Sequence, residues 1–195
     1  MYSEKSIQEF LDDLGSKKAT PGGGSAAALT AALNAAVVEF IANLTIGKEK
    51  YKDVEAEAEE ILNESRELKK EMLQMVDQDS EILRNILDSY KSGDEQKIQN
   101  TCNNAVEFSL DMAKRAVRLM RLSLEISEIG NQMLASDFEV AAYLGEAAVG
   151  SSIANIKINL KNIENEDYKE NIKKEYSKLK NESAELKKEI IENAN

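Results

Sequence analysis

Several residue types are rare or missing in this chain, and each scarcity excludes a class of function. No histidine occurs among the 195 residues, so the most common general base and a frequent metal ligand are both absent. One proline and 5% aromatic residues offer little support for a β-sheet protein. The single cysteine, Cys102, cannot form an internal disulfide, as is typical of a reducing cytoplasm. Acid–base chemistry must therefore use Asp, Glu, Lys, Tyr or the substrate itself.

Basic residues are also in the minority. The chain has 36 acidic and 25 basic residues and a net charge of −11, whereas nucleic-acid binding requires clustered lysine and arginine. The N-terminal 15 residues carry several acids and no continuous apolar run, so we expect no secretory signal. We also expect no membrane segment, because no stretch of about 18 apolar residues lacks charge. These features predict a cytoplasmic protein without nucleic-acid or membrane partners.

The abundant residues are good helix formers, and apolar positions recur at helical spacing. The pattern predicts an all-α fold, an antiparallel helical bundle forming a single domain over residues 1–195. We expect a short first helix that is capped by Ser3 and ends near Gly15. The remaining helices are two largely buried central helices, about 25–46 and 124–160, and amphipathic outer helices, about 51–90, 95–122 and 165–195.

Three glycines open directly into the first central helix, in the sequence Pro21-Gly22-Gly23-Gly24-Ser25. Backbone N–H groups at the positive end of a helix attract anions, and glycine leaves them unshielded by side chains. We therefore interpret Gly22, Gly23, Gly24 and Ser25 as candidate substrate-binding residues. The alternative is a flexible linker followed by Ser25 as an N-cap.

Asp79 stands where the apolar stripe of the helix at about 51–90 calls for a leucine. Asp77, two residues earlier, belongs to another face. Burial disfavours the charged form of a carboxyl group and raises its pKa towards the range useful for proton transfer. Asp79 is therefore a candidate catalytic acid–base. Alternatively, it forms hydrogen bonds inside the bundle or an ion pair with Arg115 or Arg118.

A second aspartate, Asp137, occupies a stripe position in the helix at about 124–160, next to Ser136. An unpaired buried charge costs several kcal/mol, so two such acids indicate function more strongly than one. We expect Asp79 and Asp137 to point inward from separate helices into one dry cleft. A purely structural polar network is the alternative.

Amides and one lysine complete the set of candidate residues. Asn155 and Asn159 are four residues apart on one helix face, and Asn131 precedes them, so their amides are candidates for binding a heterocycle. Asparagine pairs can equally bridge helices. Lys48 follows Gly47 on a predicted loop from which it can reach a carboxylate tail, although surface lysines are usually only solvated.

Five segments, in this order, resemble the formimidoyltetrahydrofolate cyclodeaminase and methenyltetrahydrofolate cyclohydrolase family. The resemblance runs from about Phe10 to Ile163. One departure is Glu107, where the family pattern has a proline. The segments are PGGGSAAA (21–28), LTIGKEKY (44–51), VDQDS (76–80), GN with SDFEVAA (130–142) and NIKINLKNI (155–163).

This resemblance implies an all-α homodimeric enzyme that binds a folate. The implied reaction is hydrolysis of 5,10-methenyltetrahydrofolate to 10-formyltetrahydrofolate, or conversion of 5-formimidoyltetrahydrofolate to the methenyl form with loss of ammonia. We favour hydrolysis slightly, because stand-alone members are often cyclohydrolases. No metal and no cofactor beyond the tetrahydrofolate substrate are expected.

The hypothesis assigns roles to the candidate residues. Asp79 is the principal acid–base, and Asp137 is a second acid or orients the substrate. The expected substrate-binding residues are Gly22, Gly23, Gly24, Ser25, Lys48, Asn131, Ser136, Asn155 and Asn159.

Two other classes of function compete with this hypothesis. A non-enzymatic helical adaptor would explain the Lys- and Glu-rich helix at about 165–195, but not an aspartate within each of two apolar stripes. An anion-binding regulatory domain would need a set of basic residues that the sequence does not display.

Overall fold

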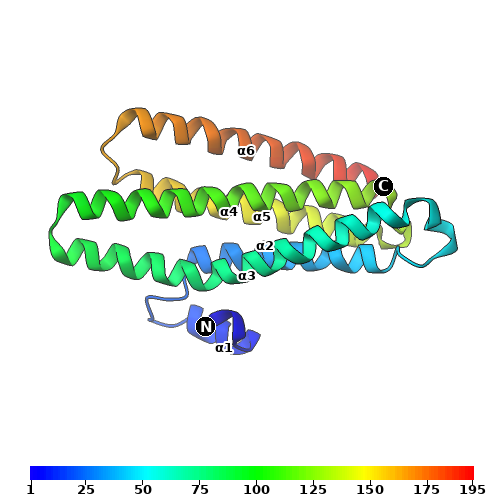
Figure 1. The fold of residues 1–195 in the computed structure, drawn as a ribbon, viewed down its shortest axis with the longest axis horizontal. Helices are drawn as coiled ribbons and strands as arrows, with labels where there is room; N and C mark the ends of the chain where they lie inside the picture. The colour runs from blue at the N-terminus through cyan, green and yellow to red at the C-terminus, as the bar shows by residue number, and fades with distance from the viewer.

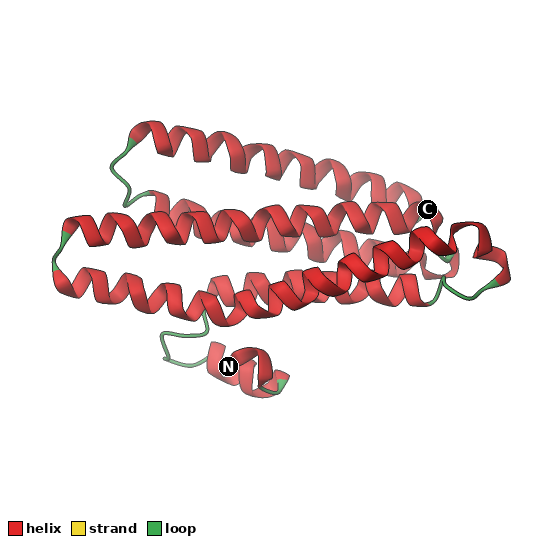
Figure 2. Ribbon diagram, in the orientation of Figure 1, coloured by secondary structure: helices red, strands yellow, loops and turns green.

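The computed structural model describes residues 1–195 and contains helices and loops but no strand (Figure 2), which confirms the predicted all-α class. Short 3₁₀ turns cover Tyr2–Glu4, Glu49–Val54 and Gln132–Leu134. The α-helices are α1 (Ile7–Leu14), α2 (Gly23–Asn43), α3 (Glu55–Ser92), α4 (Glu95–Ile129), α5 (Ala135–Leu160) and α6 (Glu166–Asn193).

Helices α2 to α6 run side by side and reverse direction at each connection, as Figure 1 shows, while α1 lies apart beside α3. The α3–α4 hairpin extends past the first turn of α2 at one end of the molecule. Because of this overhang, the N-terminus of α2 faces side chains from the middle of α3. The opposite end holds the loop between α2 and α3 and the connection between α4 and α5.

Helix α2 is the most buried helix, with 12 of its 21 residues inaccessible to solvent. Half of these are alanines, which allow neighbouring helices to approach closely. Helix α5 was also predicted to be largely buried, but only ten of its 26 residues are buried in the single chain. The reason is a row of small and apolar residues on α5 that faces solvent, including Val140 and Tyr143.

Three predicted helix boundaries are wrong, and at two of them the side chain of another residue supplies the cap. Ser6, not Ser3, caps α1, accepting a hydrogen bond from the Glu9 N–H at 3.2 Å. Helix α2 begins at Gly23, so Ser25 lies inside its first turn. The predicted helix at about 124–160 is divided, because α4 continues to Ile129 and Asn131 then caps a new turn.

Two features of single helices qualify the sequence expectations. Helix α2 is long and apolar enough to cross a membrane by length and composition, and 61% of its most apolar stretch is buried inside the chain. Helix α4 runs without interruption through Glu107, the position that departs from the family pattern. The Glu107 carboxylate accepts a hydrogen bond from the Tyr168 hydroxyl of α6 at 2.6 Å.

Candidate active site

The carboxylate of Asp79 lies directly against the first turn of α2. Its Oδ2 atom accepts a hydrogen bond from the Ser25 N–H at 2.8 Å and another from the Ser25 hydroxyl at 2.7 Å. Helix α2 has no side-chain cap of its own, so Asp79 from α3 fills that role across the interface. The N-terminus of α2 therefore lies against an acidic side chain from another helix.

This close approach requires glycine at position 24. A β-carbon built on Gly24 would lie 1.9 Å from Oδ1 of Asp79, whereas one built on Gly22 would meet nothing within 4 Å. The N–H groups of Gly23 and Gly24 form no hydrogen bond within the chain. Two free donors at the positive end of a helix therefore lie beside a carboxylate.

Burial raises the pKa of Asp79 above its ordinary value, and the hydrogen bonds from Ser25 act in the opposite direction. The alternative ion pairs are absent, because Arg115 binds Asp111 and Glu71 instead, and Arg118 binds Glu64 and Glu125. Asp79 is thus a half-buried carboxyl group without a cationic partner. Such a group is suited to transferring a proton near neutral pH.

A pocket of about 330 Å³ opens next to Asp79, within the size range of small-molecule sites. One wall is polar and contains the glycine turn, Asp79 and the amides of α5, and the other is apolar. The lining residues are Gly22, Gly23, Gly24, Asp79, Ile82, Leu83, Ile86, Ala105, Phe108, Ser109, Asn155, Ile158, Asn159 and Asn162. We refer to this as the glycine-turn pocket.

The amides of Asn155 and Asn159 line the glycine-turn pocket, at the end of α5 where the sequence predicted hydrogen-bonding groups. The Asn155 amide nitrogen donates to the Ser151 carbonyl at 3.1 Å, and that of Asn159 donates to the Asn155 carbonyl at 2.9 Å. Their amide oxygens accept no hydrogen bond within the chain. Both oxygens are thus free to accept from a ligand.

Asp137 does not line the glycine-turn pocket. It lies in the first turn of α5, 18 residues before Asn155, and at ~1.5 Å per residue this is about 27 Å along the helix. The expectation that Asp79 and Asp137 point into one cleft is therefore wrong within a single chain. Ser136, beside Asp137, is exposed.

Lys48 and Asn131 also lie at the far end of the bundle. Lys48 is exposed and precedes the 3₁₀ turn at Glu49–Val54. Asn131 is 4% exposed, and its amide nitrogen donates to the Leu44 carbonyl at 3.2 Å while its N–H donates to the Thr45 hydroxyl at 3.0 Å. Asn131 thus links the connection between α4 and α5 to the loop between α2 and α3. The predicted site residues consequently form two groups, one at each end of α5.

Sequence reasoning missed several residues of the glycine-turn pocket. Phe108 offers an aromatic face, and Ile82, Leu83 and Ile86 of α3 supply apolar surface. The helical spacing of these three α3 residues indicated that they face the core, which is partly correct. Only the overhang of the α3–α4 hairpin beyond α2 leaves them beside a pocket.

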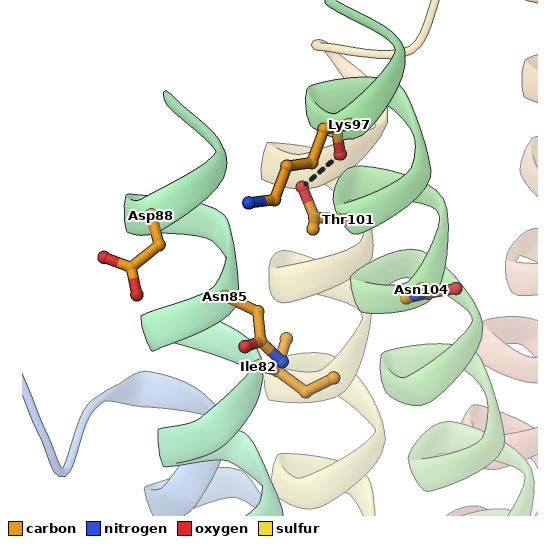
Figure 3. Close-up of a pocket in the computed structure, with 6 residues that line it drawn as sticks. All are labelled: Ile82, Asn85, Asp88, Lys97, Thr101 and Asn104. Atoms are coloured by element: carbon orange, nitrogen blue, oxygen red, sulfur yellow. Dashed lines mark hydrogen bonds between the residues drawn. The ribbon is translucent and has the colours of Figure 1, made fainter. Parts of the chain in front are cut away.

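A smaller pocket of about 250 Å³ lies between the ends of α3 and α4 and shares Ile82 with the glycine-turn pocket. Figure 3 shows Asn85 and Asp88 projecting from α3, with Lys97, Thr101 and Asn104 on α4. Its lining is polar apart from Ile82.

The chain resembles characterised proteins over nearly its whole length. Residues 6–178 match the family described as Formiminotransferase-cyclodeaminase. A methenyltetrahydrofolate cyclohydrolase of Methylorubrum extorquens is 33% identical, covering 98% of this chain and 97% of that protein. A crystal structure of formiminotetrahydrofolate cyclodeaminase from Thermotoga maritima superposes with a TM-score of 0.95 at 29% identity, covering 99% of this chain and 97% of that one.

A longer relative, the formimidoyltransferase-cyclodeaminase of Rattus norvegicus, is 27% identical over 92% of this chain but only 35% of its own length.

Fold and pocket together define a helical-bundle protein with an acidic small-molecule site. The chain belongs to the formiminotransferase-cyclodeaminase family, which confirms the resemblance found in the sequence.

The contact between Gly24 and Asp79 yields a first prediction. Gly24→Ala forces the Asp79 carboxylate away from Ser25 and destabilises the fold by about 1–3 kcal/mol, a typical cost of overpacking. Gly22→Ala is the matched control, because its β-carbon meets open space at a φ of −133°. Urea unfolding of both variants measures the difference. Equal stability of the two variants would contradict the described contact.

Proposed function

We propose that this chain is a folate one-carbon enzyme that hydrolyses 5,10-methenyltetrahydrofolate to 10-formyltetrahydrofolate. The observation that carries the proposal is Asp79, a partly desolvated carboxyl group beside free backbone N–H donors in a pocket. The full-length similarity to a methenyltetrahydrofolate cyclohydrolase supports the choice of substrate. We further propose that the enzyme works in the cytoplasm and needs no metal or cofactor other than its folate substrate.

The charge of the proposed substrate fits the pocket. The methenyl bridge between N5 and N10 carries a positive charge, and the Asp79 carboxylate is the acidic side chain lining the glycine-turn pocket. The attraction between an ionised group and an opposite charge on a bound substrate is stronger in a water-poor site than in bulk solvent. The amide oxygens of Asn155 and Asn159 are acceptors for the N–H groups of the pterin ring.

The proposed reaction requires three proton transfers, two of them through Asp79. Water attacks the bridging carbon while Asp79 accepts one of its protons, and a tetrahedral centre forms. The bond from this carbon to N5 then breaks, and Asp79 returns the proton to N5. The remaining hydroxyl proton is lost to solvent as the formyl C=O forms. The free N–H groups of Gly23 and Gly24 are suited to stabilising charge that develops on oxygen.

Cyclodeamination is the second candidate reaction, and the close superposition on the Thermotoga maritima cyclodeaminase favours it. Here N10 attacks the formimidoyl carbon and ammonia leaves, again through a tetrahedral centre. The same carboxyl group serves both reactions, because each needs a proton removed from a nucleophile and one delivered to a departing nitrogen.

Purified protein is expected to consume methenyltetrahydrofolate faster than the buffer does, as followed by its absorbance. The same assay started from 5-formimidoyltetrahydrofolate detects cyclodeamination as a rise in that absorbance. Absence of both changes in folded protein would refute the proposed function. The ratio of the two rates decides which reaction dominates.

Asp79→Asn is expected to lower turnover by about 10²- to 10⁴-fold, the usual contribution of a positioned acid–base. Asparagine retains an oxygen for the Ser25 hydrogen bonds, so the fold should persist. Since the folded pKa of Asp79 is raised, its ionisation costs stability as the pH rises from about 3.8 through that raised value. The variant should thus be at least as stable as the wild type at neutral pH.

The dependence of the reaction rate on pH offers a second test of the role of Asp79. Wild-type activity should fall on the acidic side at a pH above the ordinary aspartate value of 3.8, because the base must be ionised. Near-wild-type turnover in folded Asp79→Asn would show that another group performs the proton transfer.

We also propose that the enzyme is a homodimer formed through the outer faces of α2 and α5. The two helices pack against each other, and each exposes large apolar side chains, among them Leu33 and Phe40 on α2 and Val140 and Tyr143 on α5. The sole charged residue of α2, Glu39, is paired with Lys69 of α3 at 2.7 Å. A contiguous apolar face of this kind usually marks an interface.

A catalytic role for Asp137 remains a prediction that depends on this dimer. In a dimer with two-fold symmetry, both copies use the same face. If the two-fold axis is perpendicular to the helices, the helices of one copy run antiparallel to those of the other. Such a pairing brings the first turn of α5 in one copy towards the glycine-turn pocket of the other.

Phe40→Glu combined with Tyr143→Glu is expected to convert a dimer into monomers and to reduce activity, since a buried unpaired charge is costly. Leu11→Glu is the control, because Leu11 is 54% exposed on α1, away from this face. Sedimentation velocity with a parallel activity assay measures both effects. A monomeric wild type, or a double variant that remains dimeric, would refute the interface.

A further inference from the structure

The two aspartates of the VDQDS segment each hold a different part of the chain. Asp79 accepts hydrogen bonds from Ser25 at the start of α2. Asp77 lies about 200° away around α3 and accepts hydrogen bonds from the Tyr2 N–H and the Ser3 hydroxyl. The first 3₁₀ turn is therefore fastened to α3 by an acid that takes no part in the proposed proton transfers.

Tyr2 extends this attachment to the loop at 15–22, which joins α1 to α2 (Figure 1). Its hydroxyl donates a hydrogen bond to the Thr20 carbonyl at 2.7 Å. An edge-to-face contact with Phe10, with the ring centroids 6.0 Å apart, restrains the Tyr2 ring. Asp77 and Thr20 are thus connected through one packed residue.

Residues 19–21 lead directly into the glycine turn, and little else holds them. Of their backbone groups, only the Thr20 carbonyl forms a hydrogen bond with the rest of the chain, the one donated by Tyr2. Ala19 is exposed, and the buried Pro21 has no N–H to donate. The Tyr2 hydroxyl is therefore the polar anchor of this stretch.

Packing restrains the glycine turn itself only weakly. A β-carbon on Gly22 would meet nothing within 4 Å, and one on Gly23 would meet only the Asn155 side chain, at 3.9 Å. Glycine has more backbone freedom than other residues, so a turn built from it keeps one conformation only when its flanks are fixed. The Asp79 carboxylate fixes one flank, and the Tyr2 hydroxyl fixes the other.

We propose that Tyr2 and Asp77 are positioning residues for the reaction, because together they fix the glycine turn that lines the substrate pocket. This inference rests on the proposed function, in which the free N–H groups of Gly23 and Gly24 stabilise developing charge. Such groups act only when they point at the reacting atoms, and a displacement of about 1 Å can cost about 10²-fold in rate. Neither positioning residue lines the glycine-turn pocket, so Asp77 acts through Tyr2, and Tyr2 acts through Thr20.

Tyr2→Phe tests the proposal, because it removes the hydroxyl and keeps the ring. With methenyltetrahydrofolate as substrate, the variant should lose about threefold to tenfold in kcat, the rate equivalent of one hydrogen bond, while KM stays within about twofold. Hydrogen exchange of the Ser25 amide should become faster by a similar factor, because the turn before it opens more often. Urea unfolding confirms that the variant is folded under the assay conditions.

Ser16→Ala is the matched control. The Ser16 hydroxyl also donates to a backbone carbonyl at 2.7 Å, that of Asp13, within the same loop. This bond lies on the α1 side of the loop and does not restrain the glycine turn. The control should therefore keep the wild-type kcat and the wild-type exchange rate of the Ser25 amide.

Variants of Asp77 test the connection through Tyr2. Asp77→Ala should lower kcat by a similar factor, whereas Asp77→Asn keeps an acceptor oxygen and should recover much of the loss. Two residues that act through one contact are not additive. Asp77→Ala combined with Tyr2→Phe should thus lower kcat no further than the more severe single variant.

Several outcomes would overturn the proposal while the proposed function stands. These are an unchanged kcat in Tyr2→Phe, an equal loss in Ser16→Ala, or losses that multiply in the double variant, each with an active wild type. If the folded wild type turned over neither methenyltetrahydrofolate nor 5-formimidoyltetrahydrofolate, the proposed function would fail, and the positioning role with it.

Discussion

The hydrogen bonds between the Asp79 carboxylate and Ser25 are the contact on which the candidate site depends. They join the middle of α3 to the first turn of α2, at the point where the α3–α4 hairpin extends beyond α2. Bonds to an ionised acceptor are stronger than neutral ones, and they offset part of the cost of removing a carboxylate from water. The contact exists only because residue 24 has no side chain.

The same contact explains why a structural and a catalytic interpretation of Asp79 are compatible. One carboxylate oxygen, Oδ2, takes both hydrogen bonds from Ser25. The other, Oδ1, accepts no hydrogen bond within the chain. A group that is held by one oxygen and free at the other is fixed in position yet able to exchange a proton.

Local sequence patterns predicted the features that depend on one helix at a time. The all-α class, the apolar α2 helix and the anomalous position of Asp79 in its stripe all follow from helical spacing. Asp137 shows the limit of that reasoning. A stripe tells which residues share a face, but not what covers it, and the face of α5 that carries Val140 is exposed in the single chain. The distance of Asp137 from Asp79 follows from the topology of the bundle alone.

Residues brought together by chain reversal were the hardest to predict. Lys157, Lys161, Lys169 and Lys173 are spread over the end of one helix and the start of the next, so the sequence suggested only solvated charges. The turn between α5 and α6 places them on one groove. The same reversal explains why the sequence displayed no set of basic residues.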